Sequence, residues 1–470
     1  MKLPAYDQYK MGGSEWCEPI PAHWSIEPLK YNSYVKGRIG WQNLRSDEFT
    51  DEGPFLITGM HFKDGSVDWN QCYHITEERY AIAPEIQVRQ DDVLITKDGS
   101  IGKLAHLREL PGKASLNSHL LVIRPLRERY IPRYLYLLLS SLAFRFHIEL
   151  HQSGTTFFGI TQESVVKFGV ILPSIPEQRA IVAFLDREIG RVDQLVAKKR
   201  ELIERLKEKR TALISRTVTR GLPPAAARVA GLPENPPLKP SALDWLGDIP
   251  AHWGIPPLYT RYSIELGKML DEARIVGHAL VPYLRNIDVQ WDHINLEDLP
   301  EMDIEDTERE RFTIRAGDLL VCEGGEVGRA AIFSGRNEIT GYQKALHRMR
   351  PLNRHEDPRF MFYILAWASS QGVFMAQGNP NTISHLTGEK LRRYRFPQPP
   401  FLEQVAIAAY LDKQTAKLDA LVAKVESAIE RLQEYRTALM TAAVTGKIDV
   451  RETALDEAAS KPRESATVET

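Results

Sequence analysis

The sequence predicts an α+β protein built from two globular domains, each followed by one long helix. Three observations predict this class: a repeat that relates the first half of the chain to the second, a long heptad pattern at the end of each half, and short apolar runs of the kind that form strands. The chain has 470 residues, of which 43% are hydrophobic and 26% charged. This length is enough for two or three domains with apolar cores.

An internal repeat organises the chain. Residues 20–24 and 249–253 both read Ile-Pro-Ala-His-Trp, an offset of 249 - 20 = 229. From Arg89 the sequence RQDDVLITKDGSIGK aligns with RAGDLLVCEGGEVGR from Arg315, at 315 - 89 = 226. The 226 offset then continues through Glu-Gln pairs near residues 177 and 403, so each half is one globular domain followed by one helix.

Local patterns predict the elements of the first half. Apolar runs broken by Gly and Asp predict strands at residues 55–58, 92–96 and 120–123. Residues 132–150, which begin with Pro and have apolar side chains at helical spacing, predict one buried helix. The Pro- and Gly-rich segment 221–239 predicts a link without regular structure. The polar, Ala-rich residues from 451 onward predict a disordered tail.

The expected domain boundaries follow from these patterns. The expected parts are globular domains at residues 1–174 and 244–399, long helices at residues 175–218 and 400–446, a linker at residues 219–243 and a flexible tail at residues 447–470.

The two long helices show the clearest periodicity. From Leu185 and again from Leu411, alternating steps of four and three visit nine positions, of which seven are apolar and the next to last is Arg. This spacing is typical of a coiled-coil seam, so we expect the two helices to pair. The apolar seam residues are Leu185, Ile189, Val192, Val196, Ile203, Leu206, Leu213, Leu411, Leu418, Val422, Val425, Ile429, Leu432 and Leu439.

Composition argues against several classes of protein. The sequence has no signal-peptide pattern and no run of about 18 apolar residues, so we expect a cytoplasmic protein without a membrane span. Cys17, Cys72 and Cys322 lie far apart, which predicts neither a disulfide framework nor a C-x-x-C metal site. The formal net charge is -2, so the chain carries no global surplus of positive charge for DNA phosphates.

Patterns that would supply catalysis or bind a metal are incomplete. Asn235-Pro-Pro-Leu238 is similar to the Asn-Pro-Pro-aromatic motif of adenine methyltransferases, but Leu replaces the aromatic residue that covers the flipped base. Gly99-Ser-Ile-Gly-Lys103 lacks the length of a P-loop and the Ser or Thr after Lys. His147 and His151 are four residues apart, but without a third ligand we expect packing or surface roles and no metal.

The order of these parts resembles the specificity subunit of type I restriction-modification enzymes. The resemblance extends from about residue 9 to residue 449. It is carried by Trp245-Leu-Gly-Asp-Ile-Pro-Ala-His-Trp253, the Gly-rich blocks at residues 98–103 and 324–329, the Glu-Gln start of each long helix, and an Arg-Thr-Ala-Leu near each helix end. The first half departs from the pattern at Trp16-Cys-Glu-Pro-Ile20, so we expect that segment to pack differently.

The resemblance implies a non-catalytic DNA-binding subunit. Its two target-recognition domains would each read one half of a split, asymmetric site. The helices would form an antiparallel coiled coil, relate the halves by a pseudo-two-fold, set the gap between half-sites and dock other subunits. The implied partners are double-stranded DNA, modification (methyltransferase) subunits and restriction (endonuclease/translocase) subunits. No cofactor is expected on this chain, whereas S-adenosylmethionine, ATP and Mg are expected in the partner subunits.

We expect loop residues of both domains to contact DNA, because Arg, Lys, Asn and Gln read base edges while Ser, Thr and backbone amides hold phosphates. The loop from Lys97 to Lys103 is the strongest candidate, since Gly lets the backbone approach a phosphate closely. The candidates in the first domain are Lys36, Arg38, Lys97, Ser100, Lys103, Asn117, His119, Gln152, Thr155 and Thr156. Those in the second are Lys268, Arg285, Asn286, Arg329, Gln343, Lys344, Asn379, Asn381 and Thr382.

Two alternative hypotheses remain open at this stage: the recognition portion of a self-contained methyltransferase or nuclease, and a structural coiled-coil adaptor that binds no DNA. The first would need a cofactor-binding Gly-rich motif and an Asn/Asp-Pro-Pro-aromatic motif, neither of which the sequence contains. Between the shared blocks the halves diverge, as Ser-Leu-Asn-Ser-His at residues 115–119 aligns with Gly-Tyr-Gln-Lys-Ala at residues 341–345. Such different donors and acceptors predict that the two domains read different sequences.

Overall fold

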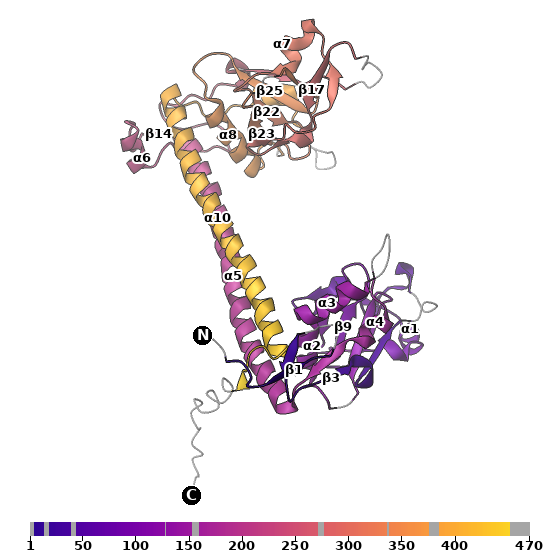
Figure 1. Cartoon of the computed structure of the whole chain (residues 1–470). Helices are drawn as coiled ribbons and strands as arrows, with labels where there is room; N and C mark the ends of the chain where they lie inside the picture. The colour runs from indigo at the N-terminus through magenta and orange to yellow at the C-terminus, as the bar shows by residue number, and fades with distance from the viewer. Residues whose placement is uncertain are drawn as a thin grey trace. The chain divides into compact units, whose positions relative to one another are not determined.

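The chain folds into two compact units. The computed structural model describes residues 4–13, 18–38, 44–126, 128–152, 159–270, 277–335, 338–375 and 385–451. Unit 1 comprises residues 1–199 and 426–470, and unit 2 comprises residues 200–425. Each unit therefore contains one globular part together with segments of both long helices, α5 (Ile175–Arg220) and α10 (Phe401–Val444), which are labelled in Figure 1.

The globular part of unit 1 is built on two small sheets. An antiparallel sheet has the order β10-β9-β12-β4, and a mixed sheet has the order β11-β5-β8, in which β11 and β5 are parallel. Strand β9 is a run of Val, Leu, Ile and Thr that is buried at every position, as expected for a central strand. These strands are β4 (Ser33–Gly37), β5 (Thr50–Ile57), β8 (Tyr73–His74), β9 (Val93–Thr96), β10 (Leu104–His106), β11 (Ala114–Leu116) and β12 (Leu120–Pro125).

Shorter elements complete unit 1. Strand β3 pairs with β13, β1 with β2, and β6 with β7, all antiparallel. The additional elements are β1 (Tyr9–Met11), β2 (Pro19–Pro21), β3 (Ser25–Pro28), β6 (Phe62–Lys63), β7 (Ser66–Val67), β13 (Gly169–Leu172), α1 (Glu77–Ala81), α2 (Pro132–Leu139), α3 (Leu142–His151) and α4 (Gln162–Lys167).

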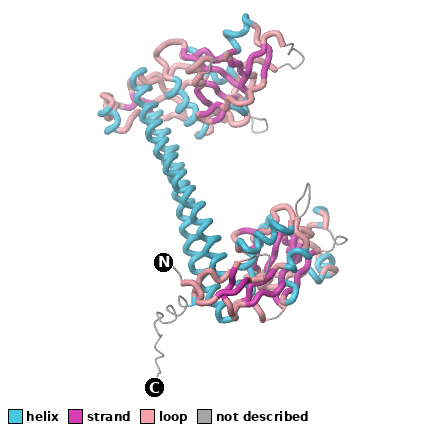
Figure 2. Tube along the Cα trace, in the orientation of Figure 1, coloured by secondary structure: helices cyan, strands magenta, loops and turns pink. Residues whose placement is uncertain are grey.

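Unit 2 repeats this plan. Its antiparallel sheet β16-β25-β22-β23 has the same order as β4-β12-β9-β10, and β17 pairs in parallel with β24 as β5 does with β11. Figure 2 shows the strands of each globular part in magenta. The elements are β14 (Leu238–Pro240), β15 (Asp248–Pro250), β16 (Tyr262–Leu266), β17 (Leu280–Leu284), β18 (Val289–Gln290), β19 (His293–Ile294), β20 (Glu301–Asp303), β21 (Thr313–Ile314), β22 (Leu319–Cys322), β23 (Ala330–Ile332), β24 (Thr340–Tyr342), β25 (Leu346–Pro351), α6 (Pro224–Val229), α7 (Arg309–Phe312), α8 (Pro358–Ser370) and α9 (Gly388–Arg393).

The long helices run antiparallel to each other within each unit. In unit 1 the Arg436 Nε lies 3.1 Å from Asp193 Oδ1, and in unit 2 the Arg210 Nε lies 3.0 Å from Asp419 Oδ1. Both pairs join residues whose numbers add to 629, which is the signature of one antiparallel register. All predicted seam residues are buried or half-buried. The predicted antiparallel coiled coil and the pseudo-repeat of the fold class are therefore confirmed.

The identical pentapeptides place a tryptophan in each core. Trp24 in unit 1 and Trp253 in unit 2 are both fully buried. Each lies next to the glycine that ends a long helix: a Cβ added at Gly446 would lie 3.0 Å from Trp24, and one added at Gly221 would lie 3.6 Å from Trp253. Both glycines have positive φ, of 75° and 82°, which favours glycine after a helix.

Three predictions about local structure were wrong. Residues 132–150 form two helices, α2 and α3, rather than one, with Ser140 and Ser141 between them. The segment 221–239 contains helix α6, and its end belongs to strand β14, so it is more than an unstructured link. Residues 447–450 of the predicted tail pack on unit 1, with Val450 fully buried in its core.

Two further predictions fall on parts of the chain that are not described. The remainder of the tail, residues 452–470, lies outside the described residues, and so do Trp16 and Cys17 of the divergent N-terminal segment. Within the described ranges, no helix has the length and apolar character needed to cross a membrane.

Candidate nucleic-acid interface

The Glu of each Glu-Gln pair anchors the pentapeptide to a long helix. Glu177 accepts hydrogen bonds from His23 Nε2 at 2.8 Å, from Trp24 Nε1 at 3.3 Å and from the Ser174 hydroxyl at 2.9 Å. Burial raises the pKa of Glu177, but these hydrogen bonds outweigh burial and the net pKa is lowered. In unit 2 the equivalent His252 Nε2 donates to Glu403 at 2.8 Å. The repeated His–Glu hydrogen bond therefore attaches each pentapeptide to the start of its long helix.

The Gln of each pair ties together three backbone groups. Gln178 accepts from the Ile131 N–H at 2.9 Å and donates to the carbonyls of Arg129 and Pro173, each at 3.0 Å. In unit 2 the corresponding glutamine makes the same set of bonds, with the Asp357 N–H and the carbonyls of His355 and Pro399. Both glutamine side chains are fully buried.

Repeated ion pairs complete this shared scaffold. Arg124 pairs with the buried Asp92 at 2.7 Å, as Arg350 does with Asp318 at 2.6 Å. A second repeated pair joins a helix of the globular part to a long helix: Arg133 to Asp186 in unit 1, and Arg359 to Asp412 in unit 2. These residues, which recur between the halves, therefore stabilise the fold. A surface that reads DNA must be sought where the halves differ.

A groove of about 700 Å³ lies in unit 1 at such a divergent place. It brings together three of the predicted DNA-contacting residues, Ser100, Asn117 and His119, which come from two loops. The other lining residues are Thr58, Gly59, Met60, Tyr73, Thr96, Asp98 and Gly99. Because the walls come from segments between residues 58 and 119, the groove is a product of tertiary folding.

Hydrogen bonds hold the two polar loops of this groove in place. The Thr96 hydroxyl donates to the Ser100 carbonyl at 2.5 Å and accepts from the Lys103 N–H at 2.9 Å. The Lys97 N–H donates to the His119 carbonyl at 2.9 Å, which ties the first loop to the second. Gly99 has a φ of 67°, and a Cβ added there would meet no other atom within 4 Å, so its backbone lies open to a ligand.

The polar side chains of the groove contact each other. His119 Nδ1 lies 2.6 Å from Asp98 Oδ1, and the Asn117 side-chain oxygen accepts from the His119 N–H at 3.1 Å. Met60 is 77% exposed and Tyr73 is 38% exposed, so the groove also offers apolar surface. Met60, Tyr73 and Asp98 were absent from the predicted site. An exposed methionine after a strand gives no sequence signal of its own, whereas Asp98 lies inside the predicted loop.

The remaining candidates of unit 1 differ in accessibility. Lys36, Lys103 and Gln152 are exposed and Lys97 is half-buried, so each can reach a ligand. The prediction that Arg38 contacts DNA was wrong. Its side chain is only 5% exposed and donates to the Leu116 carbonyl at 2.9 Å and to the Ser115 hydroxyl at 3.2 Å. Burial lowers its pKa to about 10. Thr155 and Thr156 lie outside the described residues.

Several of the predicted DNA-contacting residues of unit 2 form hydrogen bonds or ion pairs within the protein. Asn286 donates its amide to the carbonyls of Gly324 and Ala345, and its side-chain oxygen accepts from Arg329 at 3.0 Å. The side chain of Asn286 therefore connects segments of the protein and is poorly placed to read a base, which corrects the prediction that it contacts DNA. Arg285 pairs with Asp288 at 2.8 Å.

Other candidates of unit 2 remain accessible in varying degree. Lys268 pairs with Glu308 at 2.5 Å and is 24% exposed. Gln343 is half-buried and Lys344 is exposed, so both can reach a ligand. Asn379, Asn381 and Thr382 lie outside the described residues.

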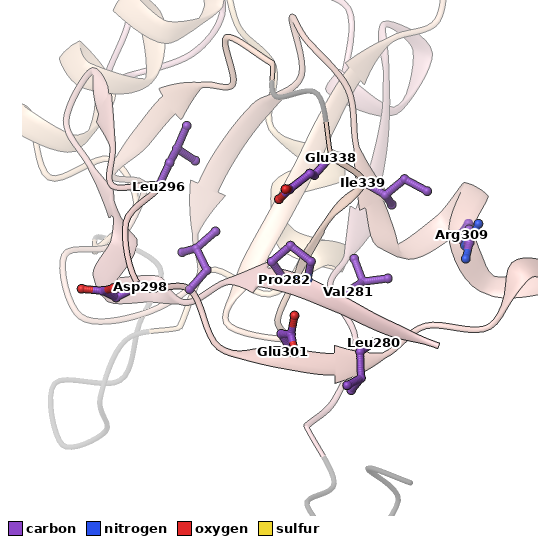
Figure 3. Close-up of a pocket in the computed structure, with 10 residues that line it drawn as sticks. Leu280, Val281, Pro282, Leu296, Asp298, Glu301, Arg309, Glu338 and Ile339 are labelled. Carbon is purple, nitrogen blue, oxygen red and sulfur yellow. The ribbon is translucent and has the colours of Figure 1, made fainter. Parts of the chain in front are cut away.

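A second hollow, of about 520 Å³, lies on strands β17 and β20 of unit 2 (Figure 3). It is lined by three carboxylates, Asp298, Glu301 and Glu338, and by one cation, Arg309. None of the predicted DNA-contacting residues lines it. An excess of carboxylates repels phosphate, so we do not assign this hollow to DNA.

The histidines considered for a metal make ordinary hydrogen bonds. His147 Nε2 bonds to the Ser164 carbonyl at 2.9 Å, and His151 Nδ1 bonds to the His147 carbonyl at 2.9 Å. Among the described residues there is no group of three or more His, Cys, Asp or Glu side chains placed to hold a metal ion.

Comparisons with known proteins agree with this architecture. A family model described as the type I restriction modification DNA specificity domain matches residues 43–205 and 297–431, more than half of the chain. The chain is 21% identical over 452 residues to the type I restriction enzyme StySPI specificity subunit of Salmonella potsdam, covering 91% of this chain and 90% of that protein. It is 22% identical over 455 residues to the EcoKI specificity subunit of Escherichia coli K12, with the same coverage.

A solved structure shares the fold. A chain from a study of complex assembly and conformational transition of the type I R-M system superposes with a TM-score of 0.67 at 18% identity, covering 91% of this chain and 99% of that chain. The family match spans both globular parts, as the internal repeat requires. The resemblance seen in the sequence is thus confirmed: the chain belongs to the family of type I restriction-modification specificity subunits.

Proposed function

We propose that this chain is the non-catalytic DNA-specificity subunit of a type I restriction-modification complex. The observation that carries the proposal is the division of residues within the repeat. The buried networks around Glu177 and Gln178 recur in unit 2, whereas the groove residues Asp98, Asn117 and His119 align with Gly324, Gln343 and Ala345. Two similar scaffolds with different exposed polar groups suit the reading of two different half-sites.

Each unit would read one half of a bipartite, asymmetric DNA site. Lys97 and Lys103 flank the groove-lining residues of unit 1 and would contact phosphate. In unit 2 the exposed Lys344, which aligns with Ser118 of the second loop, would do the same. Phosphate contacts fix the position of a protein on the duplex, and base contacts supply the specificity. The hypothesis of an adaptor that binds no DNA does not account for these divergent polar loops.

The paired helices would dock the other subunits. Leu195 and Leu202 of α5 are more than 40% exposed and lie seven residues apart, on one face and outside the seam. Exposed apolar side chains on a helix are typical of a protein interface. The proposed partners are modification and restriction subunits, which would bind S-adenosylmethionine, ATP and Mg and perform methyl transfer and cleavage in the cytoplasm.

Co-purification and DNA binding test the proposal. Because the formal net charge is -2, the purified chain alone should bind DNA weakly at physiological salt. Addition of the modification subunit should give a tight gel shift on one specific sequence. A nanomolar, sequence-specific complex from the chain alone would contradict the dependence on partners, and no co-purification with no shift would leave only the adaptor hypothesis.

A further inference from the structure

The Asp98–His119 pair belongs to unit 1 alone. Its two side chains approach to 2.6 Å between His119 Nδ1 and Asp98 Oδ1, and they remain 61% and 39% exposed. At the 226 offset unit 2 has Gly324 and Ala345, which cannot form such a pair. The fold of unit 2 exists without it, so the pair is not required by the shared scaffold.

The geometry of the pair leaves hydrogen-bond acceptors in the groove. When the His119 Nδ1–H donates to Oδ1, the second carboxylate oxygen of Asp98 has no hydrogen-bond donor among the described residues and can accept from a ligand, and Nε2 of a neutral imidazole is an acceptor as well. In the major groove, acceptors of this kind select the exocyclic amino group of adenine or cytosine. The charge of Asp98 also disfavours a phosphate at this point.

Apolar side chains beside the pair narrow the choice of base. Met60 and Tyr73 line the same groove and are both exposed. The Tyr73 ring is held by stacking on Phe49, with centroids 4.7 Å apart, and by an edge contact with His61 at 5.1 Å. An A·T pair presents both an amino group and the thymine methyl in the major groove, whereas a G·C pair has no methyl.

We propose that Asp98, positioned by His119, is a specificity-determining residue of unit 1 that selects an A·T base pair. The carboxylate of Asp98 accepts from the adenine N6 amino group, and Met60 and Tyr73 contact the thymine methyl. Lys97 and Lys103 of the same loop contact the flanking phosphates. This assignment rests on the proposed function, in which unit 1 reads one half-site.

Base analogues test the assignment in the complete complex with its modification subunit. Each adenine of the recognised site is replaced in turn by purine, which lacks the amino group, and each thymine by uracil, which lacks the methyl. At one position of one half-site, purine should weaken binding of the wild-type complex by about 5- to 100-fold, the range typical of one base contact. Asp98→Asn should lose most of this preference, because its one amide oxygen accepts from the His119 Nδ1–H and the amide NH2 that replaces the second carboxylate oxygen is a donor.

A second variant tests the contact with the thymine methyl separately, and a third serves as the control. Met60→Ala should reduce the discrimination between thymine and uracil at the same base pair and leave the effect of purine in place. Glu163→Gln is the matched control: it also removes one carboxylate from an exposed ion pair in unit 1, with Lys167 at 2.7 Å, but it lies on α4 and does not line the groove. It should show the wild-type response to both analogues.

The outcomes distinguish this inference from the proposed function. If Asp98→Asn keeps the wild-type response at every position while the complex still reads a split site, Asp98 is not a reader and the proposed function stands. A G·C pair at the position that responds to Asp98→Asn would also overturn the assignment. If the wild-type complex prefers no sequence at all, the proposed function itself fails. An unchanged melting temperature of Asp98→Asn confirms that the variant is folded.

Discussion

Single buried side chains determine how each globular part is fixed to its long helix. Gln178 and Gln404 each satisfy one N–H and two carbonyls of segments that have no regular structure to satisfy them. Buried backbone groups without a partner are costly, so these two side chains stabilise loops that the helices alone could not hold.

Replacement of Gln178 by alanine should destabilise unit 1. The substitution leaves the Ile131 N–H and two carbonyls without their partner, and an unsatisfied buried group costs about 1 to 3 kcal/mol. The free energy of unfolding, measured by urea denaturation, should fall by at least this amount. Arg179→Ala, at the exposed neighbouring position, should change it by less than about 0.5 kcal/mol. Equal effects of the two variants would contradict the structural role of Gln178.

Glu177 should make the stability of unit 1 depend on acidic pH. Its pKa in the folded state is lower than the ordinary value of 4.5, because the hydrogen bonds from His23, Ser174 and Trp24 outweigh burial. A lowered folded-state pKa gives stability that is present above about pH 4.5 and is lost as the pH falls through the folded-state pKa. The stability difference between wild type and Glu177→Gln should therefore be largest at neutral pH and shrink below about pH 4.5. A difference that stays constant from about pH 7 to about pH 3 would refute this linkage.

At the scale of elements, the apolar seam of the long helices and the ion pairs beside it contribute differently to stability. Leu185 is fully buried in the core of unit 1, where Leu439 and Met440 of α10 also lie. The Asp193–Arg436 pair of the same unit is 56% and 33% exposed. Burial of apolar surface dominates such pairings, while exposed ion pairs mainly favour one register.

Thermal or urea denaturation of two variants should separate these contributions. Leu185→Ala should cost about 2 to 5 kcal/mol, because it removes buried methyl groups and leaves a cavity. Arg436→Ala should cost no more than about 1 kcal/mol, the range of exposed ion pairs. If Arg436→Ala proved as damaging as Leu185→Ala, the ion pair would hold the helices together and the seam would not.

The long helices could be predicted because their signals are local. The heptad period extends over many residues, and each helix ends at a glycine with positive φ. The break between α2 and α3 interrupts a continuous apolar pattern, and the Leu142 N–H at the start of α3 donates to the Thr441 hydroxyl of the distant helix α10 at 3.0 Å, a contact that no local pattern reveals. Helix α6 does have a local signal, with Pro224 at its first position followed by three alanines.

The candidate site was only partly predictable for the same reason. The loop from Lys97 to Lys103 has a visible Gly-rich pattern, and three candidate residues do line the groove. Met60 and Tyr73 reach the groove through the packing of different segments, which no local pattern reveals. Arg38 has the residue type of a DNA contact, but tertiary packing buries it.

At the scale of the whole molecule, the two halves share a scaffold and differ in their exposed loops. Strands β1 and β2 of unit 1 pair in the same register as β14 and β15 of unit 2, since Tyr9 opposes Pro21 as Leu238 opposes Pro250. The globular parts are therefore built as interchangeable modules, each attached through the same His–Glu hydrogen bond and the same set of Gln hydrogen bonds.

An exchange of modules should change the recognised site in a defined way. Replacing residues of about 10 to 173 with their counterparts from unit 2 keeps the scaffold contacts but gives both units the same reading loops. The complex should then recognise a near-palindrome made of two copies of the unit 2 half-site. Sequencing of methylated positions in DNA from cells that express the complex measures this directly. An unchanged methylation motif would show that recognition lies outside the exchanged residues.

The shared antiparallel register defines how the helices can be shortened without disturbing their seam. One heptad can be removed from each helix with the seven-residue spacing of the seam kept, for example Val196–Leu202 of α5 together with Val422–Ala428 of α10. Removing both heptads preserves the seam and shortens each helix by about 10 Å, at roughly 1.5 Å per residue. This length corresponds to about three base pairs of duplex.

The double deletion should leave both half-sites unchanged and shorten the unread gap between them by about one to three base pairs, or abolish binding because the reading loops no longer meet one face of the duplex. Deleting only Val196–Leu202 is the control: it misaligns the seam and should lower the free energy of unfolding instead. The methylation motif and the denaturation curve distinguish these results. A folded, active complex that keeps the original gap after the double deletion would show that the helices do not set the spacing.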